Sequence, residues 1–514
     1  MKNESRVKKT MLNVRMNLIC YFASFITAFF TRKILLDQLG AEFIGFTGTI
    51  GSLLSFLNLA ELGIGTAIGY VLYKPIANSE KFKINEIISV LGYLYKKIGY
   101  IILGIGIVTS LFLPVIFPNT AFSWTVIYIG FYTYIITSLI GYFVNYRAAL
   151  LSADQRNYIV TGYFQLTTTT KVILQMILAI YVQSFIVYFS VELLFGITNS
   201  IILNWKINKT YPWLKSDAKL GKQLLKKYPE ITTYTKQIFA HKVGGVVQGQ
   251  LTPFLIYSFV SLPVVALYTN YTLLAQKIGG LISAVVNSTG AAVGNLIAEG
   301  DKDKMLKVFK ELLAIRVFIA SIVAACIFEF SSPFISVWLG KQYILGEYTV
   351  ALVSVLAGLD IARGVLDQFC YGCGLFADVW APYTESTIMV LFAIAGGYFW
   401  GLPGVLCGPL ISIILIIYIW KPYYLFSRGF RINVLRYWRT FCIHIATSAT
   451  AYFTSTYFCN EVIRPTITTG GWAGLIIEGA LYLITISALS FVGFYVSSKG
   501  FRDIIDRVKI FKKR

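Results

Sequence analysis

The sequence contains few charged residues and very few histidines. Only 13% of its 514 residues are Asp, Glu, Lys or Arg, whereas soluble domains carry about 25%. The two histidines, His241 and His444, lie far apart. No metal-ligand cluster, nucleotide-sugar motif or long polar loop accompanies them. We therefore expect no catalytic residues, no metal site and no cofactor, and a membrane glycosyltransferase or polymerase remains only as a distant alternative.

Cysteine spacing gives no metal or disulfide framework either. Most of the seven cysteines fall within apolar runs, where a thiol behaves as a small apolar side chain. Cys370 and Cys373 have the spacing of a redox or zinc pair, but no second pair or nearby histidine follows. We interpret them as two unrelated thiols.

Long apolar runs fill the chain. Its hydrophobic content is 56% and its mean hydropathy is +0.68. Runs of about 20 apolar residues are long enough to cross a bilayer as helices. We predict an all-α polytopic membrane protein with about fourteen spans. They lie near 14–35, 43–73, 88–116, 122–147, 157–182, 184–206, 236–260, 263–298, 308–332, 347–371, 383–400, 402–424, 436–458 and 472–496.

The net charge of +21 comes mainly from cations in every second loop between the predicted spans. Cations crowd the amino terminus, 74–83, 206–227, 302–307, 428–431 and the tail, while the intervening loops are nearly free of them. This pattern predicts cytoplasmic termini and argues against nucleic-acid binding. No small-residue cleavage site follows the first run, so we expect that run to be a retained span rather than a signal peptide.

The stretch 32–78 is unusual among these runs. A Leu39-Gly40 turn precedes a predicted long helix that contains Asn58, Glu61 and the glycines at 63, 65 and 69. A carboxylate in a bilayer core is costly. Glu61 therefore either pairs with a cation such as Arg32 or Lys242, or couples transport to protons.

The second and eighth predicted spans are similar to each other. Both are long and end in small residues, GIGTAIGY in one and STGAAVGN in the other, and they lie six spans apart. An even offset predicts two parallel, pseudo-symmetric lobes of about six helices each. The expected divisions are 1–206 (first lobe), 207–235 (cytoplasmic linker), 236–425 (second lobe) and 426–514 (two further spans and a basic tail). The linker reads equally well as one amphipathic helix on the membrane surface or as a solvated connection.

Short motifs in this order resemble those of Wzx-type polysaccharide flippases of the multidrug/oligosaccharidyl-lipid/polysaccharide (MOP) exporter superfamily. The motifs are RKILLDQLG (32–40), LAELGIG (59–65), LYKPIA (72–77), YKK (95–97), ADQRNY (153–158), HKVG (241–244), YTNY (268–271) and AAVGN (291–295). The resemblance covers about residues 10–425. One departure is 251–254, which reads Leu-Thr-Pro-Phe where the family usually has a Thr-Asp pair.

The resemblance implies a MATE-like fold and a cargo. Such flippases move an undecaprenyl-diphosphate-linked oligosaccharide from the cytoplasmic to the outer leaflet of the bacterial inner membrane, for capsule, O-antigen or exopolysaccharide synthesis. It also implies contacts with membrane lipid and with polysaccharide polymerase and export machinery. Coupling to H⁺ or Na⁺ is left open.

Cations and amides within the predicted spans suit an anionic diphosphate and a glycan. Lys277 lies two turns from Asn270 on one helix face, and Lys96 and Lys97 point to different faces. Arg363 has acids at i−3 and i+4, so a local ion pair competes with a ligand site. The candidate substrate-binding residues are Arg32, Lys97, Lys242, Lys277, Arg363, Asn58 and Asn270, and the candidate ion-pair or coupling residues are Glu61 and Asp360.

Two rivals share the superfamily. A cation-coupled multidrug exporter is expected to have an acidic residue in its first span, yet here no carboxylate appears before Asp37 at the outer end. A lipid II flippase is expected to share the fold and the chemistry. The motifs favour the polysaccharide flippase over both.

Overall fold

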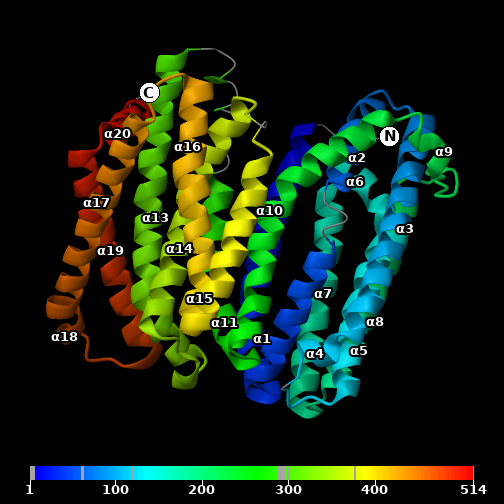
Figure 1. Ribbon diagram of the computed structural model, residues 1–514, viewed down its shortest axis with the longest axis horizontal. Helices are drawn as coiled ribbons and strands as arrows, with labels where there is room; N and C mark the ends of the chain where they lie inside the picture. Colours follow the sequence, from blue (N-terminus) through cyan, green and yellow to red (C-terminus); the bar gives the residue numbers. More distant parts are fainter. Residues whose placement is uncertain are drawn as a thin grey trace. The chain divides into compact units, whose positions relative to one another are not determined.

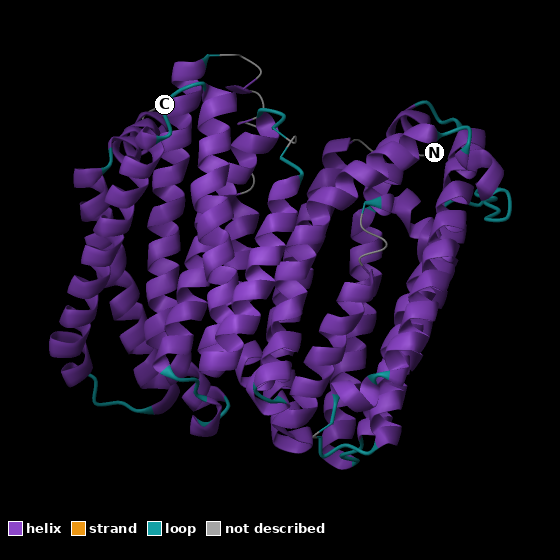
Figure 2. Cartoon of the chain, in the orientation of Figure 1, coloured by secondary structure: helices purple, strands orange, loops and turns teal. Residues whose placement is uncertain are grey.

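The computed structural model describes residues 6–58, 63–118, 120–286, 293, 296–297, 301–375 and 378–512. The described chain is helical, without β-strands (Figure 2), and this confirms the predicted all-α class. Helices satisfy their own backbone hydrogen bonds, as a lipid environment requires. The chain divides into two compact units, Met1–Ala266 (unit 1) and Leu267–Arg514 (unit 2).

Unit 1 is a bundle of long helices joined by short ones (Figure 1). Its core is formed where α1 packs on α7 and α10, and where α5 packs on α3 and α8. Its elements are α1 (Arg6–Leu57), α2 (Ile64–Ala77), α3 (Lys81–Leu111), α4 (Leu113–Ile116), α5 (Trp124–Phe143), the 3-10 helix η2 (Asn145–Arg147), α6 (Ala148–Ala153), α7 (Asn157–Tyr181), α8 (Phe185–Thr210), α9 (Gly221–Leu225) and α10 (Pro229–Phe259).

Unit 2 follows the same design, with α13 at its centre. Helix α13 packs on α14, α17, α19 and α20, so the last helices are integral to this unit. Its elements are α11 (Leu262–Val286, which begins at the end of unit 1), α13 (Lys302–Trp338), η4 (Lys341–Tyr343), α14 (Glu347–Gly372), α15 (Trp380–Ser412), the π-helix η5 (Ile413–Trp420), α16 (Lys421–Tyr424), η6 (Leu425–Phe430), α17 (Leu435–Phe458), η7 (Cys459–Ile463), α18 (Arg464–Thr466), α19 (Gly471–Ser497) and α20 (Lys499–Lys512).

Gly40 reverses the direction of α1. Its φ of 85° is a left-handed value that glycine adopts without strain. Before Gly40, Asn13 donates a hydrogen bond to the Gln155 carbonyl, just before α7 begins. Near Gly40, Gln38 accepts one from Gln183, just after α7 ends. The first half of α1 therefore runs the length of α7 up to the turn.

The second half of α1 runs back along α5. Phe43 packs against Phe122, just before α5 begins, with ring centroids 6.4 Å apart. Asn58, which directly follows α1, accepts a hydrogen bond from Tyr142 near the end of α5. The structure thus confirms the turn predicted at Leu39-Gly40.

A second reversal occurs at Gly401 in α15, where φ is 59°. A Cβ on Gly404 would collide with the Gly396 carbonyl, and a Cβ on Gly408 would collide with the Met389 carbonyl. Residues on either side of Gly401 therefore face each other as an antiparallel helix pair. This agrees with the separate spans predicted at 383–400 and 402–424.

The single long helix predicted over 43–73 is wrong. Helix α1 ends at Leu57, and α2 begins only at Ile64, after Gly63 with φ 99°. The glycines that suggested close helix packing also weaken the helix and permit a left-handed turn. The carboxyl-terminal part of the predicted eighth span, from residue 287 on, lies largely outside the described residues.

The segment predicted as a linker, 207–235, is not one amphipathic helix. It includes the end of α8, the five-residue helix α9 and the start of α10, and its backbone is tied to α3. The Lys215 amide donates to Asn85 and the Asp217 amide donates to the Ser89 hydroxyl, both at 2.9 Å. The lysine-rich composition concealed this packing because its backbone, not its side chains, makes these contacts.

Glu86 of α3 completes this attachment. Its carboxylate accepts hydrogen bonds from Lys227 at 2.8 Å and from Tyr228 at 2.6 Å. Burial, together with the adjacent carboxylate, raises the pKa of Tyr228 above its usual value. The hydroxyl therefore stays protonated and keeps donating to Glu86.

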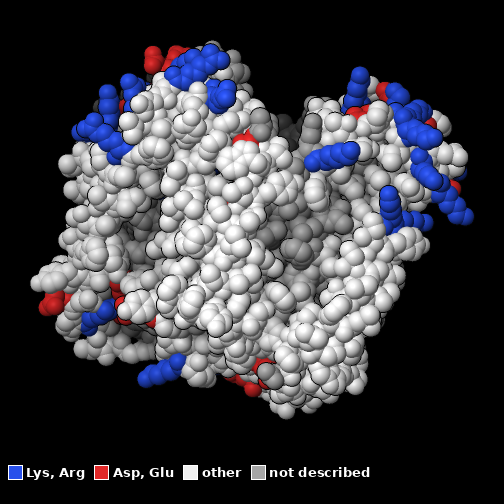
Figure 3. Space-filling view, viewed as in Figure 1, with Lys and Arg blue, Asp and Glu red and all other residues white. Residues whose placement is uncertain are grey.

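Eight helical runs in the described chain are long and apolar enough to cross a membrane. They are Arg15–Ser55, Lys81–Leu111, Trp124–Phe143, Phe185–Thr210, Lys302–Trp338, Glu347–Gly372, Trp380–Phe430 and Gly471–Ser497. Charged side chains are sparse on the visible surface, and Lys and Arg gather at the α9 end of unit 1 and the α20 end of unit 2 (Figure 3). This distribution is that of a multi-pass membrane protein.

Candidate functional site

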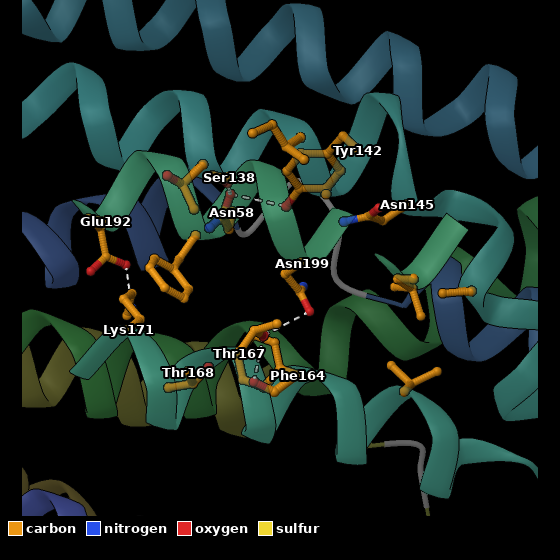
Figure 4. Close-up of a pocket in the computed structure, with 18 of the residues that line it drawn as sticks. Asn58, Ser138, Tyr142, Asn145, Phe164, Thr167, Thr168, Lys171, Glu192 and Asn199 are labelled. Carbon is orange, nitrogen blue, oxygen red and sulfur yellow. Dashed lines mark hydrogen bonds and ion pairs between the residues drawn. The ribbon is translucent and has the colours of Figure 1, made fainter. Parts of the chain in front are cut away.

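Unit 1 contains a pocket of about 540 Å³ between α5, α7 and α8 (Figure 4). We call it the unit 1 pocket. Its size is typical of a small-molecule site. It is lined by Asn58, Tyr95, Thr137, Ser138, Ile140, Gly141, Tyr142, Asn145, Ala148, Val160, Phe164, Thr167, Thr168, Lys171, Glu192, Phe195, Gly196, Asn199 and Leu203.

Helix periodicity explains why α7 contributes a polar wall. Phe164, Thr167, Thr168 and Lys171 recur at intervals of three and four residues, so they share one face. Figure 4 shows them along the same side of the pocket. Unlike α3, α5 and α8, α7 is not among the eight apolar runs. Three of its polar residues, Thr167, Thr168 and Lys171, line the pocket.

Helix α8 supplies the facing wall by the same spacing. The residues of α8 that line the pocket are spaced so that they share one helix face. They are Glu192, Phe195, Gly196 and Asn199. A Cβ on Gly196 would lie only 3.0 Å from the Thr137 side chain. Glycine at this position therefore lets α5 approach α8 closely.

Asn58 brings the end of α1 to the pocket. Its Oδ1 accepts hydrogen bonds from the Ser138 hydroxyl at 2.9 Å and the Tyr142 hydroxyl at 3.0 Å. Both donors belong to α5, one turn apart. These bonds fix the amide plane, so the Asn58 nitrogen is held in a defined direction.

Two further amides are fixed in the same way. Asn199 Oδ1 accepts from the Thr167 hydroxyl at 3.1 Å, and Asn145 Oδ1 accepts from Ser200 at 2.8 Å. Among the residues that the structure describes, the Nδ2 groups of Asn58, Asn145 and Asn199 donate no hydrogen bond. Three oriented donors are therefore available to a ligand.

The charged residues of the pocket form a pair. Lys171 Nζ lies 2.7 Å from Glu192 Oε1, with the side chains 17% and 12% exposed. Gln175 donates to the other carboxylate oxygen at 3.1 Å. The pair is thus largely removed from water. The lining of the pocket has no net charge and offers amide donors, hydroxyl groups and aromatic rings.

This combination suits the binding of a polyhydroxylated, uncharged group. Sugar hydroxyls both donate and accept hydrogen bonds, and the apolar face of a sugar ring packs on aromatic side chains. In the described part of the chain, no group of three His, Cys, Asp or Glu residues is placed to hold a metal ion.

No protein family model matches the sequence, and no curated protein sequence matches it. Solved structures do match. The lipid II flippase MurJ, in an inward closed conformation, is 14% identical over 95% of this chain and 100% of its own, with a TM-score of 0.62. An inward-facing multidrug resistance MATE family transporter of the MOP superfamily is 14% identical over 79% of this chain and 93% of its own, with a TM-score of 0.60. The chain has the fold of these transporters.

A third match agrees with this fold. A mutant of the Vibrio cholerae MATE transporter VcmN is 12% identical over 82% of this chain and 98% of its own, with a TM-score of 0.52. These neighbours of the MOP fold are transporters, not enzymes. At such low identity the likeness establishes the fold alone, and residues have to be judged from their own geometry.

Of the predicted site residues in unit 1 whose side chains the structure describes, Asn58 lines the pocket, and Arg32 and Lys97 do not. Arg32 donates to the Ala266 carbonyl at 2.9 Å. Lys97 is exposed on α3. Glu61 lies outside the described residues, and Lys242 lies in α10 with its side chain outside the described set.

Unit 2 holds the remaining predicted residues. Asn270 is fully buried in α11, and Lys277, two turns further on, is partly buried. Arg363 lies 3.5 Å from Asp367 and 3.8 Å from the largely exposed Asp360. The local ion pair considered for Arg363 is thus present in the structure.

Sequence reasoning missed the residues that build the pocket. Glu192 and Asn199 occur in an otherwise apolar run, and Thr167 and Lys171 share a face of α7. Polar residues that recur at helical spacing within a span are a readable signal of a cavity-facing stripe.

Proposed function

We propose that this protein is a flippase that translocates an undecaprenyl-diphosphate-linked oligosaccharide from the cytoplasmic to the outer leaflet of a bacterial inner membrane. It would act by alternating access, and its product would feed capsule, O-antigen or exopolysaccharide synthesis. The proposal combines the MOP fold, the motifs similar to Wzx-type flippases and the chemistry of the unit 1 pocket.

The amide donors of the unit 1 pocket carry the proposal. Spontaneous transfer of a glycan is slow because each hydroxyl would lose its hydrogen bonds in hydrocarbon. Asn58, Asn145 and Asn199 offer oriented donors among membrane-crossing helices. A pocket for cationic drugs needs an uncompensated carboxylate instead, and the Glu192 carboxylate is already paired with Lys171.

The predicted topology is part of the proposal. The runs Arg15–Ser55 and Trp380–Phe430 reverse at Gly40 and Gly401, so each supplies two spans. Helices α7, α10, α11 and α17 have 24 residues or more and are long enough to cross. These features support about fourteen spans. The basic ends of the two units support cytoplasmic termini.

The diphosphate requires cations outside the unit 1 pocket. We propose Lys277 and Lys242 as its main contacts, with Arg32, Lys97, Arg363 and Asn270 as further contributors. A cation that meets phosphate in a poorly hydrated site forms a strong charge-assisted hydrogen bond. Glu61 and Asp360 remain proposed ion-pair or coupling residues.

A lipid II flippase is the second candidate, because the structural match to the lipid II flippase MurJ covers the whole of the MurJ chain. Lipid II carries the same kind of diphosphate and lipid tail, so the two activities need similar chemistry. A multidrug exporter is a weaker candidate, since the pocket has no uncompensated carboxylate in the described chain.

Deletion of the gene followed by mass analysis of lipid-linked sugars tests the proposal. We expect an undecaprenyl-diphosphate oligosaccharide to accumulate on the cytoplasmic side and surface polysaccharide to disappear. Accumulation of lipid II would favour the second candidate instead. Unchanged lipid-linked sugars together with a changed drug sensitivity would contradict a flippase.

A further inference from the structure

The unit 1 pocket has two chemically different ends. Lys171 and Glu192 lie at one end in Figure 4, and Asn145 lies at the other, with Asn199 between them. In the described chain, Lys171 and Glu192 are the lining residues that carry formal charge. Their opposite charges, 2.7 Å apart, cancel at the pocket wall.

Gln175 holds the Glu192 carboxylate in place. Its Nε2 donates to Glu192 Oε2 at 3.1 Å and to the Tyr188 carbonyl at 3.2 Å. The Gln175 side chain is itself buried, with 2% exposure. Both carboxylate oxygens of Glu192 are therefore engaged, one by Lys171 and one by Gln175.

This arrangement disfavours an anionic ligand. An anion that contacts Lys171 also meets the Glu192 carboxylate 2.7 Å from the ammonium, so repulsion by Glu192 offsets attraction by Lys171 in a poorly hydrated site. An uncharged ring causes no such loss. It needs only the amide donors of Asn58, Asn145 and Asn199.

We infer that the unit 1 pocket is a site for an uncharged sugar ring and that Glu192 sets this preference by cancelling the charge of Lys171. This inference rests on the proposed function and deepens it. Glu192 acts as a specificity residue, and the diphosphate of the cargo is held elsewhere. Replacing Glu192 by Gln keeps the shape of the side chain but exposes the Lys171 charge to the pocket.

Binding of two matched sugars to the full-length protein in lipid nanodiscs tests the inference. Methyl glucoside and methyl glucuronide differ only at C6, which is a hydroxymethyl group in one and a carboxylate in the other. Saturation-transfer NMR with competition gives their relative affinities. We expect the wild type to favour the glucoside about tenfold, since the glucuronide carboxylate loses hydration on entering the pocket without gaining an unpaired cation.

Three variants separate charge from shape. Glu192→Gln should shift the preference toward the glucuronide about tenfold, because the carboxylate now pairs with Lys171. The double variant Lys171→Gln with Glu192→Gln is the matched control. It should keep the wild-type preference because the pocket is again neutral. Lys171→Gln alone should weaken glucuronide binding further, since it leaves the Glu192 charge uncompensated.

An unchanged preference in Glu192→Gln would mean that the pair only joins α7 to α8, and this overturns the inference. Failure of the wild type to bind either sugar overturns it as well. Neither result decides the proposed function, which depends on the lipid-linked sugar that accumulates after deletion. If that oligosaccharide accumulates but the preference is absent, the inference fails and the flippase function stands.

Discussion

Two buried ion pairs, one in each unit, have different surroundings. In unit 1, Lys171 and Glu192 face a pocket of about 540 Å³. In unit 2, Asp367 pairs with both Arg363 and Lys421 and so links α14 to α16. The unit 2 charges join helices, whereas the unit 1 pair borders a space that a ligand can fill.

A second group in unit 2 supports this contrast. Glu329 of α13 accepts hydrogen bonds from Tyr452 and Thr456 of α17, and Arg464 lies 3.4 Å from it. Arg464 also pairs with Glu478 of α19 at 2.7 Å. The last helices are thus bound to α13 by polar contacts as well as by apolar packing. A buried charge can therefore either hold helices together or line a binding site. The presence of a pocket beside it distinguishes the two roles.

The largest expected effect is on the unit 2 ion pairs. Asp367→Ala leaves Arg363 and Lys421 without their shared carboxylate, with side chains only 24% and 17% exposed. We expect a loss of about 3 kcal/mol in stability, measured by thermal unfolding in detergent. The control is Asp360→Ala, whose side chain is 74% exposed and should cost less than about 1 kcal/mol. Equal stability of the two variants would contradict the assignment of Asp367 as a joint.

Glu329→Gln tests the attachment of the last helices. It removes the negative charge near Arg464 and weakens the acceptor for Tyr452 and Thr456. We expect a loss of about 2 kcal/mol in stability. Limited proteolysis between α17 and α19 should become faster. The control is Glu461→Gln, at an exposed position in η7. An equal loss of stability in this control would contradict the role of Glu329 in attaching the last helices.

Asn199→Leu tests the pocket itself. It removes an oriented donor and blocks part of the space, so export of polysaccharide should fall about tenfold. Membrane level and thermal stability should stay close to wild type, in contrast to Asp367→Ala. Thr170→Val is the control, because Thr170 is exposed on α7 and bonds only within its own helix. Normal export by Asn199→Leu would remove this pocket from the transport route.

The smallest expected effects come from the proposed diphosphate contacts. Lys277→Ala and Lys242→Ala should each reduce export about fivefold, because other cations share the diphosphate charge. The amount of protein in the membrane should not change. Lys341→Ala, at an exposed position in η4, is the control. Surface polysaccharide at the normal level with both lysines replaced would rule out these two contacts.

Much of the fold could be read from the sequence. The ends of α8, α14 and α19 lie within a few residues of the predicted spans, because apolar length sets them. The turn at Gly40 could be read because polar residues such as Asp37 and Gln38 separate the two apolar runs there. The break before α2 could not, since residues on both sides of it are equally apolar. The docking of the linker on α3 depends on Asn85, Glu86 and Ser89, which are distant in sequence.

The candidate site was predicted only in part. Asn58 stood out as a polar residue at the end of a span, and the structure places it in the pocket. Arg32 and Lys97, the other predicted residues of unit 1 with described side chains, do not line it. Glu192 was not predicted because its neighbours in α8 are apolar. Burying its carboxylate in a membrane costs as much free energy as burying that of Glu61.

The sequence by itself determined that this is an all-α protein of membrane-crossing helices, because length and hydropathy act locally along the chain. Only the tertiary structure decided which polar residues meet. Lys171 and Glu192 belong to different helices, and so do Thr167 and Asn199. Helical spacing gives each residue a face, but the packing of α5, α7 and α8 decides whether two faces close on each other or leave a pocket.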